Sequence, residues 1–214
     1  MASSSLLIPL SATGWAGWGW LRARRLAPLG TADRWAARAP RLVLFDRDGT
    51  LVHDVPYNGE PDMVRPVEGA RAALDLLRGA GVAVGIMTNQ SGIARGVLQE
   101  QQVDAVHARL RELLGDFEVI EICPHAQEDR CECRKPSPQM VLNAAHRMRV
   151  QPHECAVIGD IGSDVEAGLA AGARAVMVPT ELTLPHEVAA APEVATTLTS
   201  AVGMLLTSDR HVAA

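Results

Sequence analysis

The 214-residue sequence has few aromatic residues, no excess of basic residues and no long uninterrupted apolar run. Phe, Trp and Tyr make up 3% of the chain, so a core has to be built from aliphatic residues and methionine, which the 48% hydrophobic content permits. The net charge of −5 provides no basic footprint for nucleic acid, so we expect no nucleic-acid partner. The length of 214 residues fits one domain, or one domain with a tail.

Residues 1–40 differ in composition from the rest of the chain. Their apolar stretch is interrupted by Pro9, Gly14, Gly17 and Gly19, so it is too short to span a membrane, and we expect no membrane partner. Their arginines follow the apolar stretch, whereas those of a secretory signal precede it. We predict a poorly ordered extension, or a start codon placed too early; an interaction segment and a targeting segment are the alternatives.

From Arg41 onwards, short apolar runs alternate with helical patterns. The runs predict strands at 41–46, 82–88, 117–123, 155–160 and 174–179. The helical patterns predict helices at 67–81, 99–115, 137–150, 163–173 and 194–206. This alternation predicts an α/β fold with a doubly wound, mainly parallel, Rossmann-like sheet. We expect the domain to span 41–207, followed by a tail at 208–214.

Polar residues follow four of the predicted strands, where parallel sheets bind ligands. Asp46 and Asp48 follow the first strand, Thr88 ends the second, Lys135 lies beyond the third, and Asp160 ends the fourth. If the chain stays extended after the first strand, both of its carboxylates face the same side. Clustered carboxylates suit Mg²⁺, and Mg²⁺ with a lysine and a hydroxyl suits phosphoryl transfer to a nucleophilic carboxylate.

Three of the four cysteines lie with a histidine in one polar loop: Cys123, His125, Cys131 and Cys133. Three thiolates and an imidazole form a closed set for tetrahedral zinc, which indicates a structural site. Free thiols beside a chance histidine are the alternative. Clustered thiols of this kind favour a reducing compartment, so we expect a cytoplasmic protein. The fourth cysteine, Cys155, begins a predicted strand and is expected in the core.

Four segments carry a family resemblance: DRDGT (46–50), TNQSG (88–92), RKP (134–136) and GDIGSD (159–164). They resemble the four signature motifs of the haloacid dehalogenase superfamily of phosphatases. Within it, FDRDGTL, TNQSGIARG and CPH…CECRKP are similar to the D-glycero-D-manno-heptose 1,7-bisphosphate 7-phosphatases. The histidinol-phosphate phosphatases share the zinc loop, and the SGIARG continuation favours the heptose enzymes.

The resemblance implies an aspartyl-phosphate mechanism. Asp46 would attack phosphorus, and Asp48 would act as general acid and then general base. Mg²⁺ would be held by Asp46, the main-chain carbonyl of Asp48, and Asp160. Thr88 and Lys135 would stabilise the transferring phosphoryl group. The remaining substrate contacts would come from Asp54, Tyr57, Asn89, Gln90, Ser91 and Arg134, the last of which could meet a second phosphate.

Three further positions bear on this resemblance. Asp164 matches the second acid of the last motif and would support Lys135 or the metal shell. Ile161 stands where the heptose enzymes commonly have lysine, a departure that weakens any role for that side chain and slightly weakens the heptose hypothesis. His107, on a predicted helix, is expected at the surface or at an edge. Little room separates the first two motifs, so we expect no large cap domain.

The leading hypothesis is a monomeric Mg²⁺-dependent phosphatase that removes the 7-phosphate of D-glycero-D-manno-heptose 1,7-bisphosphate in nucleotide-activated heptose biosynthesis. A histidinol-phosphate phosphatase is the main alternative. A polynucleotide 3′-phosphatase shares the first motif, but the chain lacks the basic surface it needs. A non-catalytic zinc-bearing binding module is the alternative outside enzymes, and it predicts the loss of a catalytic residue, whereas all of the motif residues are present.

Overall fold

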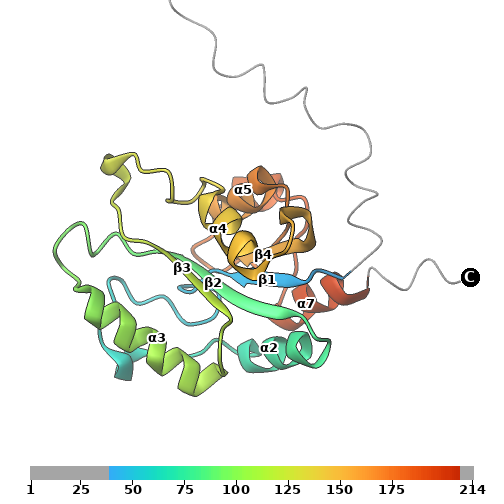
Figure 1. Cartoon of the computed structure of the whole chain (residues 1–214), viewed down its shortest axis with the longest axis horizontal. Coiled ribbons are helices and arrows are strands. Elements are labelled where there is room, and N and C mark those ends of the chain that lie inside the picture. Colours follow the sequence, from blue (N-terminus) through green and yellow to red (C-terminus); the bar gives the residue numbers. More distant parts are fainter. Residues whose placement is uncertain (1–38, 208–214) are drawn as a thin grey trace, which may run out of the picture. The chain divides into compact units, whose positions relative to one another are not determined.

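The computed structural model describes residues 39–207, which form a five-stranded sheet with helices on both faces (Figure 1). The strands are β1 (Leu42–Phe45), β2 (Ala83–Asn89), β3 (Val119–Cys123), β4 (Cys155–Gly159) and β5 (Arg174–Met177). Their order in the sheet is β3-β2-β1-β4-β5, and every pairing is parallel. The prediction of a doubly wound parallel sheet is therefore confirmed.

Five of the six helices in the described part of the chain are packed along the sheet. They are α2 (Ala70–Gly79), α3 (Glu100–Leu114), α4 (Gln139–Met148), α5 (Gly162–Ala171) and α7 (Leu198–Thr207). In Figure 1, α2, α3 and α7 lie on one side of the sheet, and α4 and α5 lie on the other. The sixth helix, α6 (Pro185–Ala190), follows β5.

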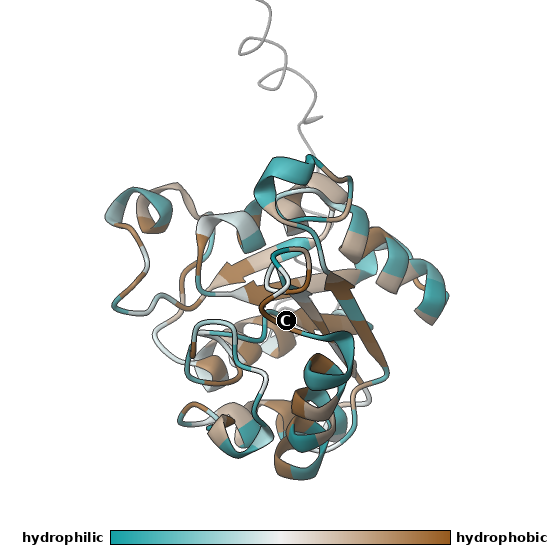
Figure 2. Cartoon of the chain, turned by 90° about the vertical axis from the view of Figure 1, so that its left-hand side faces the viewer, coloured by the Kyte–Doolittle hydropathy of each residue, from teal (hydrophilic) through white to brown (hydrophobic). Residues whose placement is uncertain are grey.

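Side chains that alternate along the strands supply the two halves of the core. Val43 and Phe45 of β1 pack with α2, α3 and α7, whereas Leu42 and Leu44 of the same strand pack with α4. All four side chains are fully buried. Figure 2 shows brown, apolar strands enclosed by helices whose outer surfaces are teal. The central strand is therefore apolar throughout, as expected for a strand covered on both faces.

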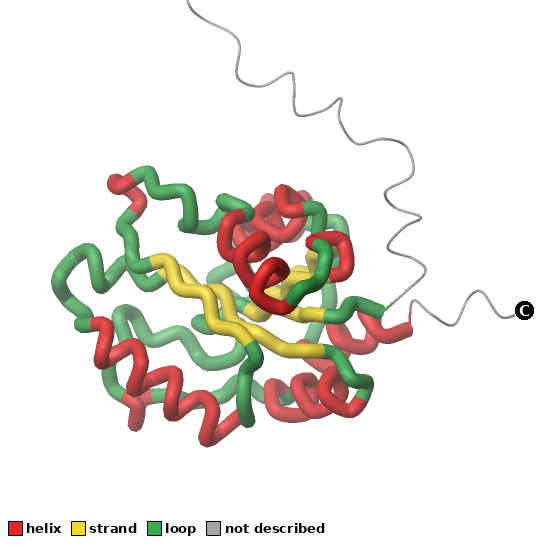
Figure 3. Tube along the Cα trace, viewed as in Figure 1, coloured by secondary structure: helices red, strands yellow, loops and turns green. Residues whose placement is uncertain are grey.

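β1 and β4 are neighbours in the middle of the sheet, and the strand order reverses between them. From β1 the chain continues to β2 and β3 on one side, whereas from β4 it continues to β5 on the other side. In open α/β sheets, ligands bind at the carboxyl ends of the strands at this switch point. The loops that leave β1, β2 and β3 are drawn in green in Figure 3 and extend well beyond the strands. They carry the polar residues singled out in the sequence.

Several element boundaries differ from the predictions. Helix α2 begins at Ala70 because Gly69, with φ of 79°, breaks the helical path before it. Helix α7 begins at Leu198, later than expected. The sequence patterns did not predict α6 or the short 3₁₀ helices Pro61–Met63, Gln127–Asp129 and Pro152–Glu154.

Between β1 and α2 the chain forms a loop with one short 3₁₀ helix, so this stretch contains no separate cap domain. None of the helices in the described range 39–207 is long and apolar enough to cross a membrane. The predictions for 208–214 and for 1–40, apart from its last two residues, concern parts of the chain outside the described range.

Candidate active site and zinc site

Asp46 lies directly after β1, and the chain turns immediately beyond it. The backbone amides of Leu51 and Val52 both donate to the carbonyl of Arg47 at 3.0 Å, and Gly49 adopts φ of 85°. The first motif therefore forms a tight turn that begins at Arg47. The turn directs the two carboxylates to different partners.

A buried group of three carboxylates and one ammonium surrounds the end of β1. Carboxylate oxygens of Asp46, Asp160 and Asp164 all lie within 4.8 Å of one another. Lys135 Nζ forms ion pairs with Asp46 and, at 2.5 Å, with Oδ1 of Asp164. These four side chains come from the ends of β1 and β4, the start of α5, and the loop after β3.

This arrangement holds more negative than positive charge in a buried place. Burial raises the pKa of the Asp46 carboxyl well above its usual value, and the carboxylates of Asp164, Asp48 and Asp160 raise it further, against the opposing effect of Lys135. Burial and Asp164 raise the pKa of Asp160 to about 6. Burial lowers the pKa of Lys135, but Asp164 and Asp46 outweigh it, and the pKa lies above its ordinary value.

The donors of this group suit a small hard cation. Three carboxylates share one lysine, so a divalent ion would neutralise the excess charge. Thr50 Oγ1 donates to Oδ1 of Asp160 at 3.1 Å and fixes that carboxylate. A Cβ at Gly49 would lie 2.4 Å from Oδ2 of Asp160, so the backbone approaches the group as closely as glycine allows. The group is therefore a candidate Mg²⁺ site.

The carboxylate of Asp48 lies outside this group of acids and faces Arg47 and Gln90. The Nε atom of Arg47 donates to both Asp48 oxygens at 3.0 Å, and Gln90 Nε2 donates to Oδ2 at 3.0 Å. Gln90 also donates to Oγ1 of the buried Thr88 at 2.8 Å. Asp48 is thereby linked to the end of β2.

A pocket of about 160 Å³ opens beside Asp48. It is lined by Arg47, Asp48, Asp54, Val55, Tyr57, Asn89, Gln90, Ser91 and Gly92. Burial and the nearby Asp48 raise the pKa of Asp54. Five of the seven residues expected to contact substrate thus line one pocket, and Arg134 and Lys135 are not among them. The polar lining suits a hydroxylated ligand.

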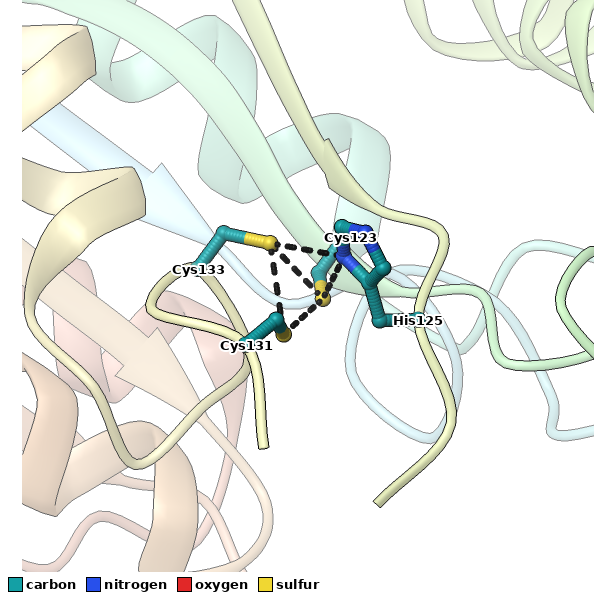
Figure 4. A group of neighbouring side chains, drawn as sticks. All are labelled: Cys123, His125, Cys131 and Cys133. Atoms are coloured by element: carbon teal, nitrogen blue, oxygen red, sulfur yellow. Dashed lines mark hydrogen bonds between the residues drawn. The ribbon is translucent and has the colours of Figure 1, made fainter. Parts of the chain in front are cut away.

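The loop after β3 brings four potential metal ligands together (Figure 4). Sγ of Cys131 lies 3.5 Å from Sγ of Cys123 and 3.6 Å from Sγ of Cys133, and the latter two are 3.0 Å apart. Nδ1 of His125 lies 3.7 Å from Cys123 and 3.2 Å from Cys133. Two sulfurs on a tetrahedral zinc are about 3.8 Å apart, so the four donors fit a closed zinc site. None of the four cysteines, all of which lie in the described range, forms a disulfide.

Hydrogen bonds join this Cys/His loop to the rim of the pocket. The amide of Gln90 donates to the carbonyl of Cys123 at 2.7 Å, and the amide of Lys135 donates to Oδ1 of Asn89 at 3.2 Å. Nη1 of Arg134 donates to the carbonyl of His125 at 3.2 Å. The loop that holds the four ligands therefore also holds Arg134 and Lys135 at this end of the sheet.

Comparison with known proteins identifies the family. Residues 132–202 match the HAD-hydrolase-like family. The chain is 38% identical over 145 residues to a D-glycero-beta-D-manno-heptose-1,7-bisphosphate 7-phosphatase of Pseudomonas putida, covering 65% of this chain and 83% of that protein. The enzyme of the same name from Rhodopseudomonas palustris is 39% identical over 149 residues, covering 64% and 83%. The chain belongs to the haloacid dehalogenase (HAD) family of phosphatases.

A solved structure agrees with this membership. The D,D-heptose 1,7-bisphosphate phosphatase of B. bronchiseptica, solved with magnesium and phosphate, superposes with a TM-score of 0.70 at 28% identity. The match covers 77% of this chain and 97% of that one. The family resemblance and the HAD-like fold inferred from the sequence are confirmed, and this HAD phosphatase is a phosphoric monoester hydrolase.

Two residues in this HAD phosphatase occupy positions that the sequence reasoning missed. His107 is 3% exposed and contacts Arg47, so the expectation of a surface or edge position is wrong. His107 lies four residues after Val103 and three before Leu110, on the buried stripe of α3. This helical spacing could have predicted its burial from the sequence. Arg47, between the two acids of the first motif, is 1% exposed and was assigned no role. As expected, Cys155 is buried.

Proposed function

We propose that this HAD phosphatase removes the 7-phosphate of D-glycero-β-D-manno-heptose 1,7-bisphosphate in nucleotide-activated heptose biosynthesis. The observation that carries the proposal is the buried pairing of Asp46 with Lys135 beside Asp160 and Asp164, next to a polar pocket. The relatives named for this reaction supply the substrate and its anomer. The magnesium and phosphate in the related structure support the same chemistry.

In the proposed reaction, a carboxylate oxygen of Asp46 attacks phosphorus, and the bond between phosphorus and the sugar oxygen breaks. Asp48 gives its proton to that departing oxygen. Asp48 then takes a proton from water, whose oxygen attacks the aspartyl-phosphate, and the bond to Asp46 breaks to release phosphate. Thr88 and Lys135 stabilise the charge on the phosphoryl oxygens.

We assign the magnesium ligands to Asp46, the main-chain carbonyl of Asp48, and Asp160. The ion would neutralise the charge that gathers where the phosphate meets the nucleophile. We propose that Asp164 holds Lys135 in place, because the two side chains form an ion pair. We propose that the sugar is contacted by five residues that line the pocket: Asp54, Tyr57, Asn89, Gln90 and Ser91. We propose that Arg134 binds the second phosphate, because a guanidinium can bind phosphate with two donors.

We propose a structural zinc ion for Cys123, His125, Cys131 and Cys133, which leave no open ligand position. Zinc would order the loop that carries Arg134 and Lys135. Because thiolates persist in a reducing compartment, we place the enzyme in the cytoplasm. We propose that it acts there as a monomer on a small phosphosugar. We assign the activity to residues 41–207, with 1–40 as an extension and 208–214 as a tail.

Phosphate release in the presence of Mg²⁺ tests the proposal. The substrates are the β and α anomers of heptose 1,7-bisphosphate and histidinol phosphate at equal concentrations. We expect the highest kcat/KM with the β anomer and a product that keeps its 1-phosphate by ³¹P NMR. Preference for histidinol phosphate would move the enzyme to histidine synthesis and overturn the substrate assignment.

Asp46→Asn separates an enzyme from a non-catalytic zinc-bearing module. We expect this variant to lose turnover while its circular dichroism spectrum is unchanged. Asp104→Asn is the matched control, because Asp104 is an exposed aspartate on α3. Equal phosphate release by the unaltered protein and the Asp46 variant would show that Asp46 is not the nucleophile.

A further inference from the structure

Arg47 has the largest fully buried side chain among the described residues, and the proposed reaction gives it no part. Its side chain is 2% exposed. A guanidinium so buried is costly unless it is paired and hydrogen-bonded. Within the described part of the chain, Asp48 is the one carboxylate that lies within ion-pair distance of it. The contacts of Arg47 therefore indicate what this buried charge does.

Arg47 holds the Asp48 carboxylate through two of its nitrogen atoms. Nε lies 3.0 Å from both Asp48 oxygens, and Nη2 lies 2.8 Å from Oδ2. Two nitrogens on one carboxylate fix its plane as well as its distance. Gln90 Nε2, at 3.0 Å from Oδ2, approaches from the end of β2. The carboxylate is thus held from the first-motif turn and from the neighbouring strand.

His107 supports Arg47 from the opposite side. Its Nε2 lies 3.4 Å from Nη1 of Arg47. Because arginine is only a donor, Nε2 has to be the unprotonated acceptor, and His107 has to be neutral. Burial, together with the charges of Arg47 and Arg111, lowers the pKa of His107 to about 4. His107 lies on α3 and does not line the pocket.

We infer that Arg47 and His107 are positioning residues, which hold the Asp48 carboxylate in one orientation beside the pocket. The inference rests on the proposed function, because it takes Asp48 as the group that donates and accepts the proton. A displacement of about 1 Å in such a group can cost about 100-fold in rate. His107 thus affects the reaction through Arg47 without contacting the substrate pocket.

Two substitutions of similar size test the support that His107 gives to Arg47. His107→Met removes the acceptor, whereas His107→Gln keeps an oxygen that can accept from Arg47. We expect His107→Met to lower kcat about tenfold or more with KM within about twofold, and His107→Gln to retain at least about half of kcat. His146→Met, at an exposed histidine on α4, is the matched control and should leave kcat unchanged.

Arg47→Lys tests the other contact. It keeps the charge but cannot contact the carboxylate through two nitrogens, so kcat should fall while KM is maintained. Unchanged kcat in His107→Met, or equal losses in His107→Met and His107→Gln, would overturn the inference. So would a rise in KM that accounts for the whole loss in kcat/KM.

Nitrogen-15 NMR of the unaltered protein provides a readout that depends on neither a variant nor turnover. We expect His107 to be neutral at pH 7 with Nε2 unprotonated; a proton on Nε2 would overturn the inference even if every variant misfolded. If the unaltered protein releases no phosphate from any substrate, the proposed function fails, and the NMR result still decides whether His107 accepts from Arg47.

Discussion

The ammonium group of Lys135 lies 2.5 Å from Oδ1 of Asp164, and the two side chains are 2% and 0% exposed. Asp164 raises the pKa of Lys135 more than Asp46 does, although burial acts in the opposite direction. Lys135 is therefore held between the proposed nucleophile and an acid on the first turn of α5. This pairing keeps the lysine charged where the phosphoryl group is expected to bind.

Lys135→Met should abolish turnover and destabilise the fold. It leaves the carboxylates of Asp46 and Asp164 buried without their cation, and breaking a buried pair in this way costs about 3–5 kcal/mol. The free energy of unfolding, measured by urea denaturation with Mg²⁺ absent, gives the loss. The double variant Lys135→Met, Asp164→Asn should recover part of it, because one of the two buried charges is gone. Additive losses in the double variant would contradict this coupling.

Removal of zinc should disturb the active site as well as the Cys/His loop. We expect one equivalent of zinc per chain by elemental analysis, and chelation should lower the Tm by about 5 °C or more. Turnover should fall in parallel, because Arg134 donates to His125 and Lys135 to Asn89 from this loop.

Substitution of single cysteines shows whether the four ligands bind the zinc. Cys131→Ser should lower the zinc content, whereas Cys155→Ala, at a cysteine buried in β4, should leave it unchanged. A zinc-free protein with unaltered Tm and kcat would show that the loop needs no metal.

The sheet could be predicted because each strand is a short apolar run and each crossover helix has its own apolar stripe. β1 and β4, for example, lie within a residue or two of their predicted positions. The six-residue helix α6 could not be predicted in this way, because it buries no side chain and so has no apolar stripe. Its Glu187 instead accepts a hydrogen bond from the amide of Gly162, a tertiary contact that no local pattern reveals.

The candidate site was predictable wherever a motif residue lies at the end of a strand, as Thr88 does, or directly after one, as Asp46 and Asp160 do. The environment of Asp48 was not, because it depends on a turn and on a histidine far away in the sequence. Arg47 lies between two acids and reads as a surface charge until His107 is brought to it from α3. Contacts between distant segments decide which polar residues are buried.

The stability of the protein should depend on pH through His107. In the unfolded chain this histidine takes up its proton at about pH 6.5, whereas in the folded protein its pKa is about 4. Between these two pKa values the unfolded chain binds more protons than the folded protein does. The free energy of unfolding therefore falls as the pH falls from about 6.5 to 4. Above about pH 6.5, His107 has no such effect. Burial disfavours the charged form of His107 most, Arg47 and Arg111 also disfavour it, and Asp48 favours it.

His107→Gln should remove this part of the acid dependence, which amounts to about 2 kcal/mol at pH 5. Urea unfolding of the variant and the unaltered protein at pH 7, 6 and 5 measures it. Other titrating groups are common to both proteins and cancel in the difference. Parallel stability curves would indicate that the pKa of His107 is the same in the folded and unfolded states.

Gly49→Ala should damage the proposed magnesium site. Its φ of 85° disfavours any residue with a Cβ by about 1–2 kcal/mol, and the added Cβ would lie 2.4 Å from Oδ2 of Asp160. Asp160 would then have to leave its contact with Thr50. We expect kcat to fall at least about tenfold and the Mg²⁺ concentration for half-maximal activity to rise.

Gly81→Ala separates the two effects in Gly49→Ala. Gly81 has a similar φ of 73°, but a Cβ there meets no atom within 4 Å. Backbone strain should cost both variants a similar part of their stability, and urea denaturation should show a larger total loss in Gly49→Ala because its Cβ also meets Asp160. The change in Mg²⁺ dependence should appear in Gly49→Ala alone, because only that Cβ displaces a carboxylate. An equal shift of the Mg²⁺ dependence in both variants would show that backbone strain is the cause. It would then contradict the assignment of Asp160 as a magnesium ligand displaced by the Cβ at position 49.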